Sequence, residues 1–227
     1  MPGQGNPSAP RSEQGKGPQT MATFLPVGAG IVLAASVASH GIAGIVHVTY
    51  AGGLAIPQTA NGVYFNAETG QSSTTPSGAP GWDIQLYGST DLFTSGNSAE
   101  SVPAWAGQFL RLESAPASAG ASALATGFTV GTKPDGAEWI AGGRVNGFTA
   151  GVANYLGFRF IAAGGTTHYA WMRLSTPSGT TGPRSIMEYA FESTPDAAIA
   201  VGAIPAPSSL MVFVASLLGG GRRRRSA

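Results

Sequence analysis

The middle of the chain alternates apolar and polar residues with the period of two that is typical of β-strands. In the segment 155–161, Arg159 lies between aromatic residues that share one face of the predicted strand with Leu156. A loop with a Gly-Gly pair follows, and the alternation resumes over 168–174. Two such runs joined by a short glycine-containing loop predict an antiparallel hairpin.

Other segments repeat this pattern and indicate further strands: 47–50, 62–65, 82–87, 108–113 and 185–192. Strands that each carry one apolar face need a second layer to cover it. The sequence therefore predicts an all-β fold, a two-sheet antiparallel β-sandwich with jelly-roll-like character, and no helix longer than about three turns between residues 45 and 201. The expected core positions are Phe158, Phe160, Trp171 and Tyr189.

Composition supports strands and turns over a helical bundle. The chain has 34 glycines and 16 prolines, and only 10% of its residues are charged. Glycine and proline interrupt helices and favour turns. The chain has no cysteine, which excludes disulfides, thiolate zinc sites and a cysteine nucleophile. No cofactor is predicted.

The charges are unevenly distributed. Four arginines stand together at 222–225, whereas residues 44–204 hold six basic and ten acidic side chains and are therefore near −4. A weakly acidic body lacks the electrostatic footprint of a nucleic-acid-binding protein. We expect no nucleic-acid partner.

The N-terminal region has the pattern of a secretion signal. Residues 1–20 are rich in Gly, Pro, Ser and Gln and predict a disordered leader. The run 24–39 is uncharged over 16 residues, a length that suits the apolar part of a signal peptide and is short for a spanning helix. We assign the signal peptide to 21–43, with cleavage after Ala38 or Ala43, and Met21 is an alternative start. Its partners would be the export translocon and signal peptidase.

The C-terminal segment 204–227 has three parts. A Pro-Ala-Pro sequence breaks the preceding structure, about a dozen apolar residues follow, and the arginine block closes the segment. The apolar run predicts a short hydrophobic helix with transient insertion in the inner membrane, and the arginines should stay on the cytoplasmic side.

This three-part layout resembles the PEP-CTERM sorting tail of Gram-negative bacteria. The residues that carry the resemblance are Pro205, Ala206, Pro207, Ser208, Arg222, Arg223, Arg224 and Arg225. The usual middle residue of the proline motif is Glu, and here it is Ala206. The resemblance implies that an exosortase processes the chain on its way to the cell surface or the extracellular polysaccharide. Residues 155–160, 164–171 and 188–192 also resemble the last strands of a β-sandwich found upstream of such tails.

These signals predict a leader at 1–20, a signal peptide at 21–43, a β-sandwich domain at 44–203 and a sorting tail at 204–227. We expect an exported, non-catalytic protein of the cell surface or extracellular matrix. The alternative is a carbohydrate-binding module that acts in the exopolysaccharide. Aromatic rings can hold the faces of sugars, and Trp105 and Trp139 are the candidate sugar-binding residues.

Candidate chemistry elsewhere is weak. His168 stands beside Tyr169 and Trp171, a combination found at sugar or metal sites, but a hydrogen-bonded strand histidine is the commoner case. Glu188 and Glu192 lie four apart on a predicted strand, about 13 Å by the rise per residue, which is too far for a glycosidase pair.

Two loops carry further acidic or hydroxyl side chains. Asp135 and Glu138 would make a thin calcium site. The segment 147–151 has the spacing of a nucleophile elbow with Thr in place of Ser, without its strand–turn–helix context. The sequence therefore predicts no catalytic residue and no metal site.

Overall fold

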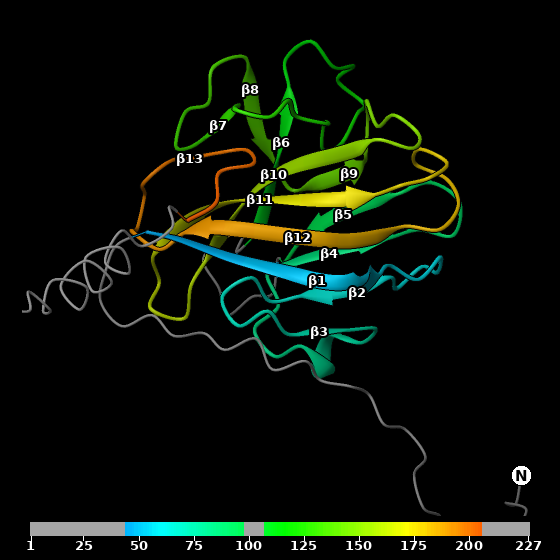
Figure 1. Cartoon of the computed structure of the whole chain (residues 1–227), viewed down its shortest axis with the longest axis horizontal. Helices are drawn as coiled ribbons and strands as arrows, with labels where there is room; N and C mark the ends of the chain where they lie inside the picture. The colour runs from blue at the N-terminus through cyan, green and yellow to red at the C-terminus, as the bar shows by residue number, and fades with distance from the viewer. Residues whose placement is uncertain (1–43, 98–106, 206–227) are drawn as a thin grey trace, which may run out of the picture. The chain divides into compact units, whose positions relative to one another are not determined.

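The computed structural model describes residues 44–97 and 107–205, and almost all of its regular structure is strand (Figure 1). Within those ranges the one helix is a short 3₁₀ turn, η1 (Pro76–Gly78), and no helix could cross a membrane. The absence of long helices from the described part of the domain is as predicted. The strands are β1 (Ile45–Ala55), β2 (Val63–Phe65), β3 (Ser72–Ser73), β4 (Ile84–Tyr87), β5 (Phe93–Gly96), β6 (Gly107–Leu112), β7 (Thr129–Val130), β8 (Ala137–Ile140), β9 (Gly142–Arg144), β10 (Ala153–Ile161), β11 (Thr167–Ser175), β12 (Ser185–Glu192) and β13 (Ile199–Ala200).

The larger sheet has six antiparallel strands in the order β1-β12-β11-β10-β6-β8. Its centre is the predicted hairpin, in which β10 and β11 pair along their full lengths with Phe158 opposite Ala170. The connecting loop closes through a hydrogen bond from the Ala162 N–H to the Thr166 carbonyl at 2.9 Å, and Gly165 has a φ of 80°. Glycine tolerates this backbone region without steric cost. The hairpin prediction is confirmed.

The second sheet has five antiparallel strands in the order β3-β2-β4-β5-β9. Two of its members, β2 and β4, fall in the predicted segments 62–65 and 82–87. The segment 71–80 contains β3 and η1, which are two and three residues long. The strands β5 and β9 have weak alternation and were not predicted.

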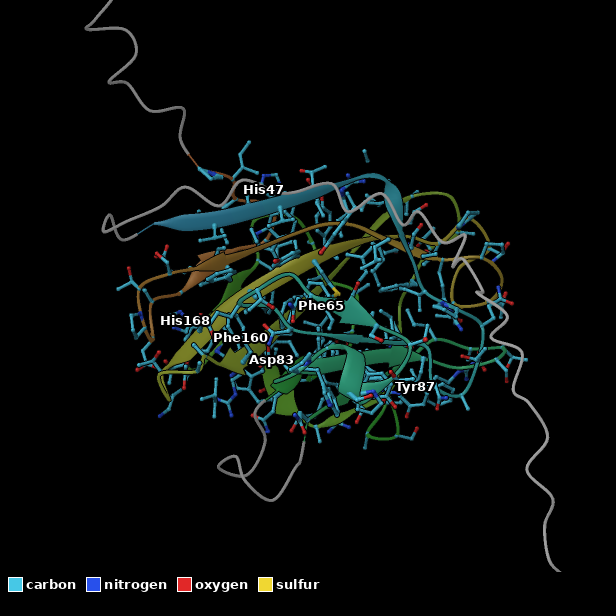
Figure 2. All side chains as sticks on the ribbon, turned by 90° about the horizontal axis from the view of Figure 1, so that it is seen from below. His47, Phe65, Asp83, Tyr87, Phe160 and His168 are labelled. Carbon is cyan, nitrogen blue, oxygen red and sulfur yellow. The ribbon has the colours of Figure 1, made fainter. Side chains whose placement is uncertain are left out.

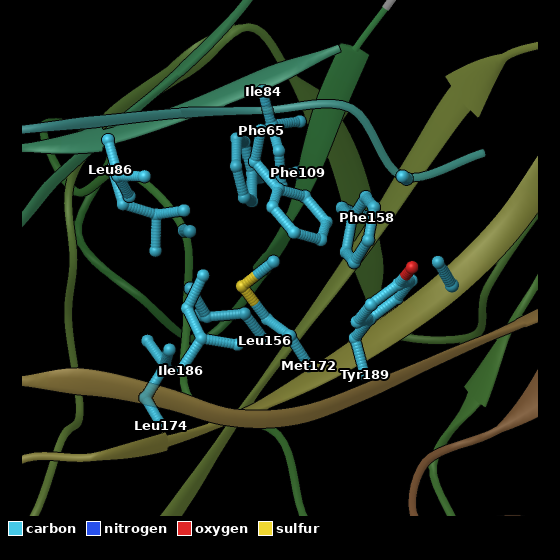
Figure 3. Close-up of a cluster of buried hydrophobic side chains, with 14 of the residues drawn as sticks. Phe65, Ile84, Leu86, Phe109, Leu156, Phe158, Met172, Leu174, Ile186 and Tyr189 are labelled. Carbon is cyan, nitrogen blue, oxygen red and sulfur yellow. The ribbon is translucent and has the colours of Figure 1, made fainter. Parts of the chain in front are cut away.

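One face of each sheet contributes to a shared core (Figure 3). Phe65, Ile84 and Leu86 of the five-stranded sheet are fully or almost fully buried with Phe158 and Tyr189 of the six-stranded sheet. The rings of Phe65 and Tyr189 meet edge to face with centroids 4.9 Å apart. The predicted core positions Phe158, Phe160 and Tyr189 therefore belong to this core.

The opposite face of the six-stranded sheet carries a second apolar cluster. Trp171 of β11 packs there with Leu110 of β6 and Ala190 of β12, under residues of the paired strands β7 and β13. Trp171 is 1% exposed, so its predicted burial is confirmed, but it points away from Phe158 and Phe160. The expectation of one apolar face per strand is wrong for β11, because β7 and β13 cover its other face.

The close approach of this cover explains a glycine in β10. A Cβ on Gly157 would lie 2.7 Å from Leu124 Cδ1 and 3.0 Å from atoms of Leu110 and Val130. Such distances are shorter than van der Waals contact, so Gly157 allows the second cluster to pack against the sheet.

The described strands begin at Ile45 and end at Ala200. The predicted leader, signal peptide and C-terminal hydrophobic helix lie outside the described residues. Of the sorting segment, Ile204 and Pro205 are described and both are exposed.

Candidate functional site

The register of the six-stranded sheet brings four chemically distinct side chains together on its outer face, the face that carries the second cluster. On β10, Arg159 lies opposite Gln108 of β6 on one side and Tyr169 of β11 on the other. Trp139 of β8 lies opposite Leu110 of β6. We call Arg159, Gln108, Trp139 and Tyr169 the outer-face cluster.

Trp139 is the aromatic centre of this cluster. Its ring stacks on that of Tyr169 with centroids 5.8 Å apart, and its Nε1–H donates to the Gly131 carbonyl at 3.2 Å. The Arg159 guanidinium carbon lies 4.9 Å from the centroid of the Trp139 ring, within the range of a cation–π contact. Trp139 is partly exposed, whereas Tyr169 is buried and donates through its hydroxyl to Thr132 Oγ1 at 2.9 Å. The indole is thus fixed in place while part of it reaches solvent.

Arg159 is held by an amide. Its Nε donates to Gln108 Oε1 at 2.7 Å, and its Nη2 donates to the same oxygen. Among the described residues no carboxylate lies within ion-pair distance of Arg159. The cluster therefore presents a positive charge that the neighbouring strands leave uncompensated.

A second polar group on the same face is self-contained. Glu188 of β12 accepts from Arg173 Nε at 2.5 Å and lies 2.9 Å from His47 Nε2. Burial acts to raise the pKa of Glu188, but the hydrogen bonds and charges of Arg173 and His47 outweigh it and lower that pKa. Glu192 is engaged elsewhere and accepts from the Thr194 N–H at 3.0 Å. The two glutamates do not form a catalytic pair.

His168 does not join the aromatic residues beside it in the sequence. Its ring stacks on Phe160 of the shared core with centroids 5.5 Å apart (Figure 2), whereas Tyr169 and Trp171 belong to the second cluster on the other face. The Nδ1–H donates to the Glu192 carbonyl at 2.8 Å, which leaves Nε2 to accept from the Thr166 hydroxyl at 3.0 Å. Both ring nitrogens are used, so this histidine serves the fold.

Asp83 is a buried carboxyl group that the sequence analysis missed. It precedes β4 and is 4% exposed, and its Oδ2 accepts from the Ala67 N–H at 2.8 Å. Burial raises the pKa of Asp83 to about 7; the Ala67 hydrogen bond opposes the rise and the nearby charge of Glu68 adds to it. In the sequence Asp83 occupies a polar position of an alternating strand, and its burial depends on distant segments such as the loop 66–71, in which Ala67 donates to its carboxyl group.

The remaining candidates do not converge. Glu138 pairs with Arg111 of the neighbouring strand, and Asp135 is exposed in the loop before β8. No group of three His, Asp or Glu side chains in the described ranges could hold a metal ion. The segment 147–151 forms bends and turns with no helix after it, so it lacks the context of a nucleophile elbow.

Several predicted site residues cannot be placed. Trp105 and the sorting residues Ala206, Pro207, Ser208, Arg222, Arg223, Arg224 and Arg225 lie outside the described residues. Pro205 is described and exposed. Of the two tryptophans proposed for sugar binding, the structure thus places Trp139 alone, and Gln108, Arg159 and Tyr169 were not singled out from the sequence.

Comparison with known proteins gave no family model, no curated protein and no solved structure that matches the chain.

Proposed function

We propose that the chain is an exported protein of the cell surface or extracellular matrix, processed by an exosortase at its C-terminal sorting signal, with a structural role. The proposal rests on the three-part segment 204–227 and its resemblance to PEP-CTERM tails, together with the signal-peptide pattern at 21–43. Its partners are the export translocon, signal peptidase and the exosortase, with transient insertion in the inner membrane.

The observation that carries the proposal is that all described strands lie, along the sequence, between the predicted signal peptide and the end of the chain that resembles a sorting tail. The last strand of the described residues ends at Ala200, and Ile204 and Pro205 are exposed. A cut beyond Pro205 would therefore remove none of the described strands. At the other end Gly44 and Ser193 exchange hydrogen bonds, from the Gly44 N–H to Ser193 Oγ and from the Ser193 N–H to the Gly44 carbonyl, both at 3.0 Å. Cleavage after Ala38 or Ala43 would leave this contact and β1 intact.

We further propose that the two sheets pack as a β-sandwich and that this sandwich is the exported domain. Support comes from the core that Phe65 and Ile84 share with Phe158. The consecutive strands β10, β11 and β12 are neighbours in one sheet, which is a meander. This connectivity departs from the jelly-roll-like arrangement expected from the sequence, in which successive strands alternate between sheets.

A structural role agrees with the way the polar side chains are used. The ring nitrogens of His168 are hydrogen-bonded within the fold, and Glu188 is neutralised by Arg173 and His47. Catalysis needs acid–base groups that converge on a point that substrate can reach. These side chains instead bond to partners within the fold.

The second candidate function is a carbohydrate-binding module in the exopolysaccharide. The observation that favours it is the partly exposed ring of Trp139 beside Arg159. Trp171, in contrast, is buried in the second cluster and cannot meet a ligand.

Cell fractionation of the native host tests the export proposal. We expect the wild-type protein at the cell surface or in the medium without Arg222–Arg225. A variant with all four arginines replaced by glutamine should pass the inner membrane without pausing, because no positive block then opposes translocation. The variant Arg144→Gln, which removes a charge from the folded domain, is the control and should be sorted like the wild type. Retention of the wild-type protein in the cytoplasm would refute the proposal.

A further inference from the structure

Among the described arginines, Arg159 and Arg184 pair with no carboxylate, and of these two Arg159 is the one that is partly exposed. Three others pair with carboxylates: Arg111 with Glu138, Arg144 with Asp91 and Arg173 with Glu188. Arg184 is 4% exposed and donates to the carbonyls of Thr180 and Gly88. Arg159 is partly exposed, and its guanidinium donates to one described acceptor, the neutral amide oxygen of Gln108.

This arrangement is costly for the fold alone. Partial burial of a cation removes part of its hydration, and a neutral amide returns less of that energy than a carboxylate does. A side chain that lowers the stability of the fold, here through an unbalanced charge, is expected at a functional site. An external anion would supply the missing charge.

Donors remain free at this point. Both nitrogens that bond to Gln108 Oε1 come from one side of the guanidinium, and Arg159 Nη1 has no partner among the described residues. Because Gln108 Oε1 accepts from Arg159, its amide nitrogen points elsewhere, and it too lacks a described partner. Neither nitrogen is among the fully buried unsatisfied atoms of the described residues, so both reach solvent. Their N–H groups suit a carboxylate, which accepts several hydrogen bonds.

The surroundings add an apolar surface, and the loop beside it carries one exposed basic and one exposed acidic side chain, Lys133 and Asp135. The exposed part of the Trp139 ring lies beside the guanidinium and is held by its bond to Gly131. The same loop carries Lys133, whose side chain is exposed, next to Thr132, the partner of Tyr169. A flat aromatic surface next to fixed donors matches the apolar face and polar edge of a sugar ring.

We propose that Arg159, Gln108 and Trp139 form a binding site for a carboxylate-bearing polysaccharide, such as a polymer of uronic acids. The sugar carboxylate accepts hydrogen bonds from Arg159 Nη1 and the Gln108 amide, and the sugar ring contacts the exposed part of Trp139. This inference rests on the second proposed function, glycan binding, and adds the chemical class of the glycan. The indole favours a sugar over an acidic peptide, because carboxylates on flexible chains gain little from a fixed flat ring.

The test is a titration of the full-length protein with alginate as the uronate polymer and dextran as the neutral polymer, at a fixed salt concentration. We expect saturable binding of alginate and not of dextran. The decisive variant is Gln108→Glu, which places a carboxylate against Arg159 and should weaken alginate binding at least about tenfold without unfolding the protein. Arg159→Gln should have a similar effect, and Arg144→Gln, the same change of charge on β9, should leave binding unchanged.

Each contrary result has a defined meaning. Equal losses in Arg144→Gln and Arg159→Gln would show general attraction to polyanions and overturn the site. Preference for dextran sulfate or polyglutamate over alginate would overturn the uronate assignment. Dextran binding that survives in Gln108→Glu would keep the glycan-binding function and reject the acidic class, and absence of all binding would overturn both. The fractionation result does not depend on any of these outcomes, so failure of the export proposal remains distinguishable.

Discussion

The two faces of the six-stranded sheet are built from the same strands and differ in what covers them. The inner face packs against the five-stranded sheet through Phe158, Phe160 and Tyr189, all at most 1% exposed. The outer face is covered by the short strands β7 and β13 over Trp171 and leaves polar side chains beside them. The inner face thus forms the larger core, and the proposed glycan site lies beside the partial cover of the outer face.

The outer face itself contains two contrasting cations. Arg173 has the carboxylate of Glu188 at 2.5 Å, whereas Arg159 has Gln108 at 2.7 Å. The charge of Arg173 is balanced by a carboxylate within the fold, whereas the charge of Arg159 is not and can attract an external anion.

The largest effect is expected on the inner face. Phe160→Ala removes a fully buried ring that meets Phe191 edge to face with centroids 5.3 Å apart. We expect a loss of about 3–5 kcal/mol in the free energy of unfolding, measured by denaturant titration. A loss below about 1 kcal/mol would mean that the inner face is not the main core.

Asp83 should make the stability of the domain depend on pH. Its pKa in the folded protein is about 7 because of burial, above its ordinary value of 3.8. The protonated form therefore stabilises the fold below the ordinary pKa, and this contribution is lost as pH rises to about 7. Asp83→Asn stays neutral at every pH.

The free energy of unfolding of Asp83→Asn, relative to that of the wild type, should therefore rise by on the order of 2–4 kcal/mol between pH 4 and 7. Above pH 7 the difference should stay constant. Denaturant titrations of both proteins at several pH values measure this difference. A difference that does not vary with pH would contradict the burial of Asp83.

Gly157→Ala tests the cover on the outer face. The new methyl group would lie 2.7 Å from Leu124 Cδ1, so the cover must shift or the strand must bend. We expect a loss of about 1–3 kcal/mol on thermal or chemical unfolding. As a control, Gly164→Ala places a methyl group in open space and should have a much smaller effect. Equal effects would argue against close packing by β7 and β13.

The smallest change in stability is expected at Glu188, the carboxylate that balances the charge of Arg173. Glu188→Gln removes the charge that Arg173 and His47 share, at a cost of about 1 kcal/mol near neutral pH. Because the pKa of Glu188 is lowered in the fold, its contribution is present above the ordinary carboxyl pKa and is lost as pH falls. The difference from the wild type should therefore shrink in acid. If it grows instead, the ion pairs do not stabilise the fold.

The sequence predicts the strands whose alternation is strong. The hairpin of β10 and β11 follows from the regular spacing around Arg159 and its glycine loop, and β12 follows from its alternating apolar side chains. The side on which Trp171 packs could not be predicted, because β7 and β13 are two residues long and come from distant segments.

The outer-face cluster was missed for a similar reason. Arg159 and Gln108 are 51 residues apart, and only the register of β10 with β6 joins them. Burial raises the pKa of Asp83, and the packing around this residue likewise involves a contact distant in the sequence, because the N–H of Ala67, 16 residues earlier, donates to its carboxyl group. Local patterns predict elements, whereas charge balance at a site depends on which strands become neighbours.

In the proposed export the domain is released by cleavage at both ends, and intact mass spectrometry of the protein isolated from its native host measures both cuts. We expect one mature species that begins after Ala38 or Ala43 and lacks Arg222–Arg225. A mature species that retains both residues 21–38 and the four arginines would contradict it.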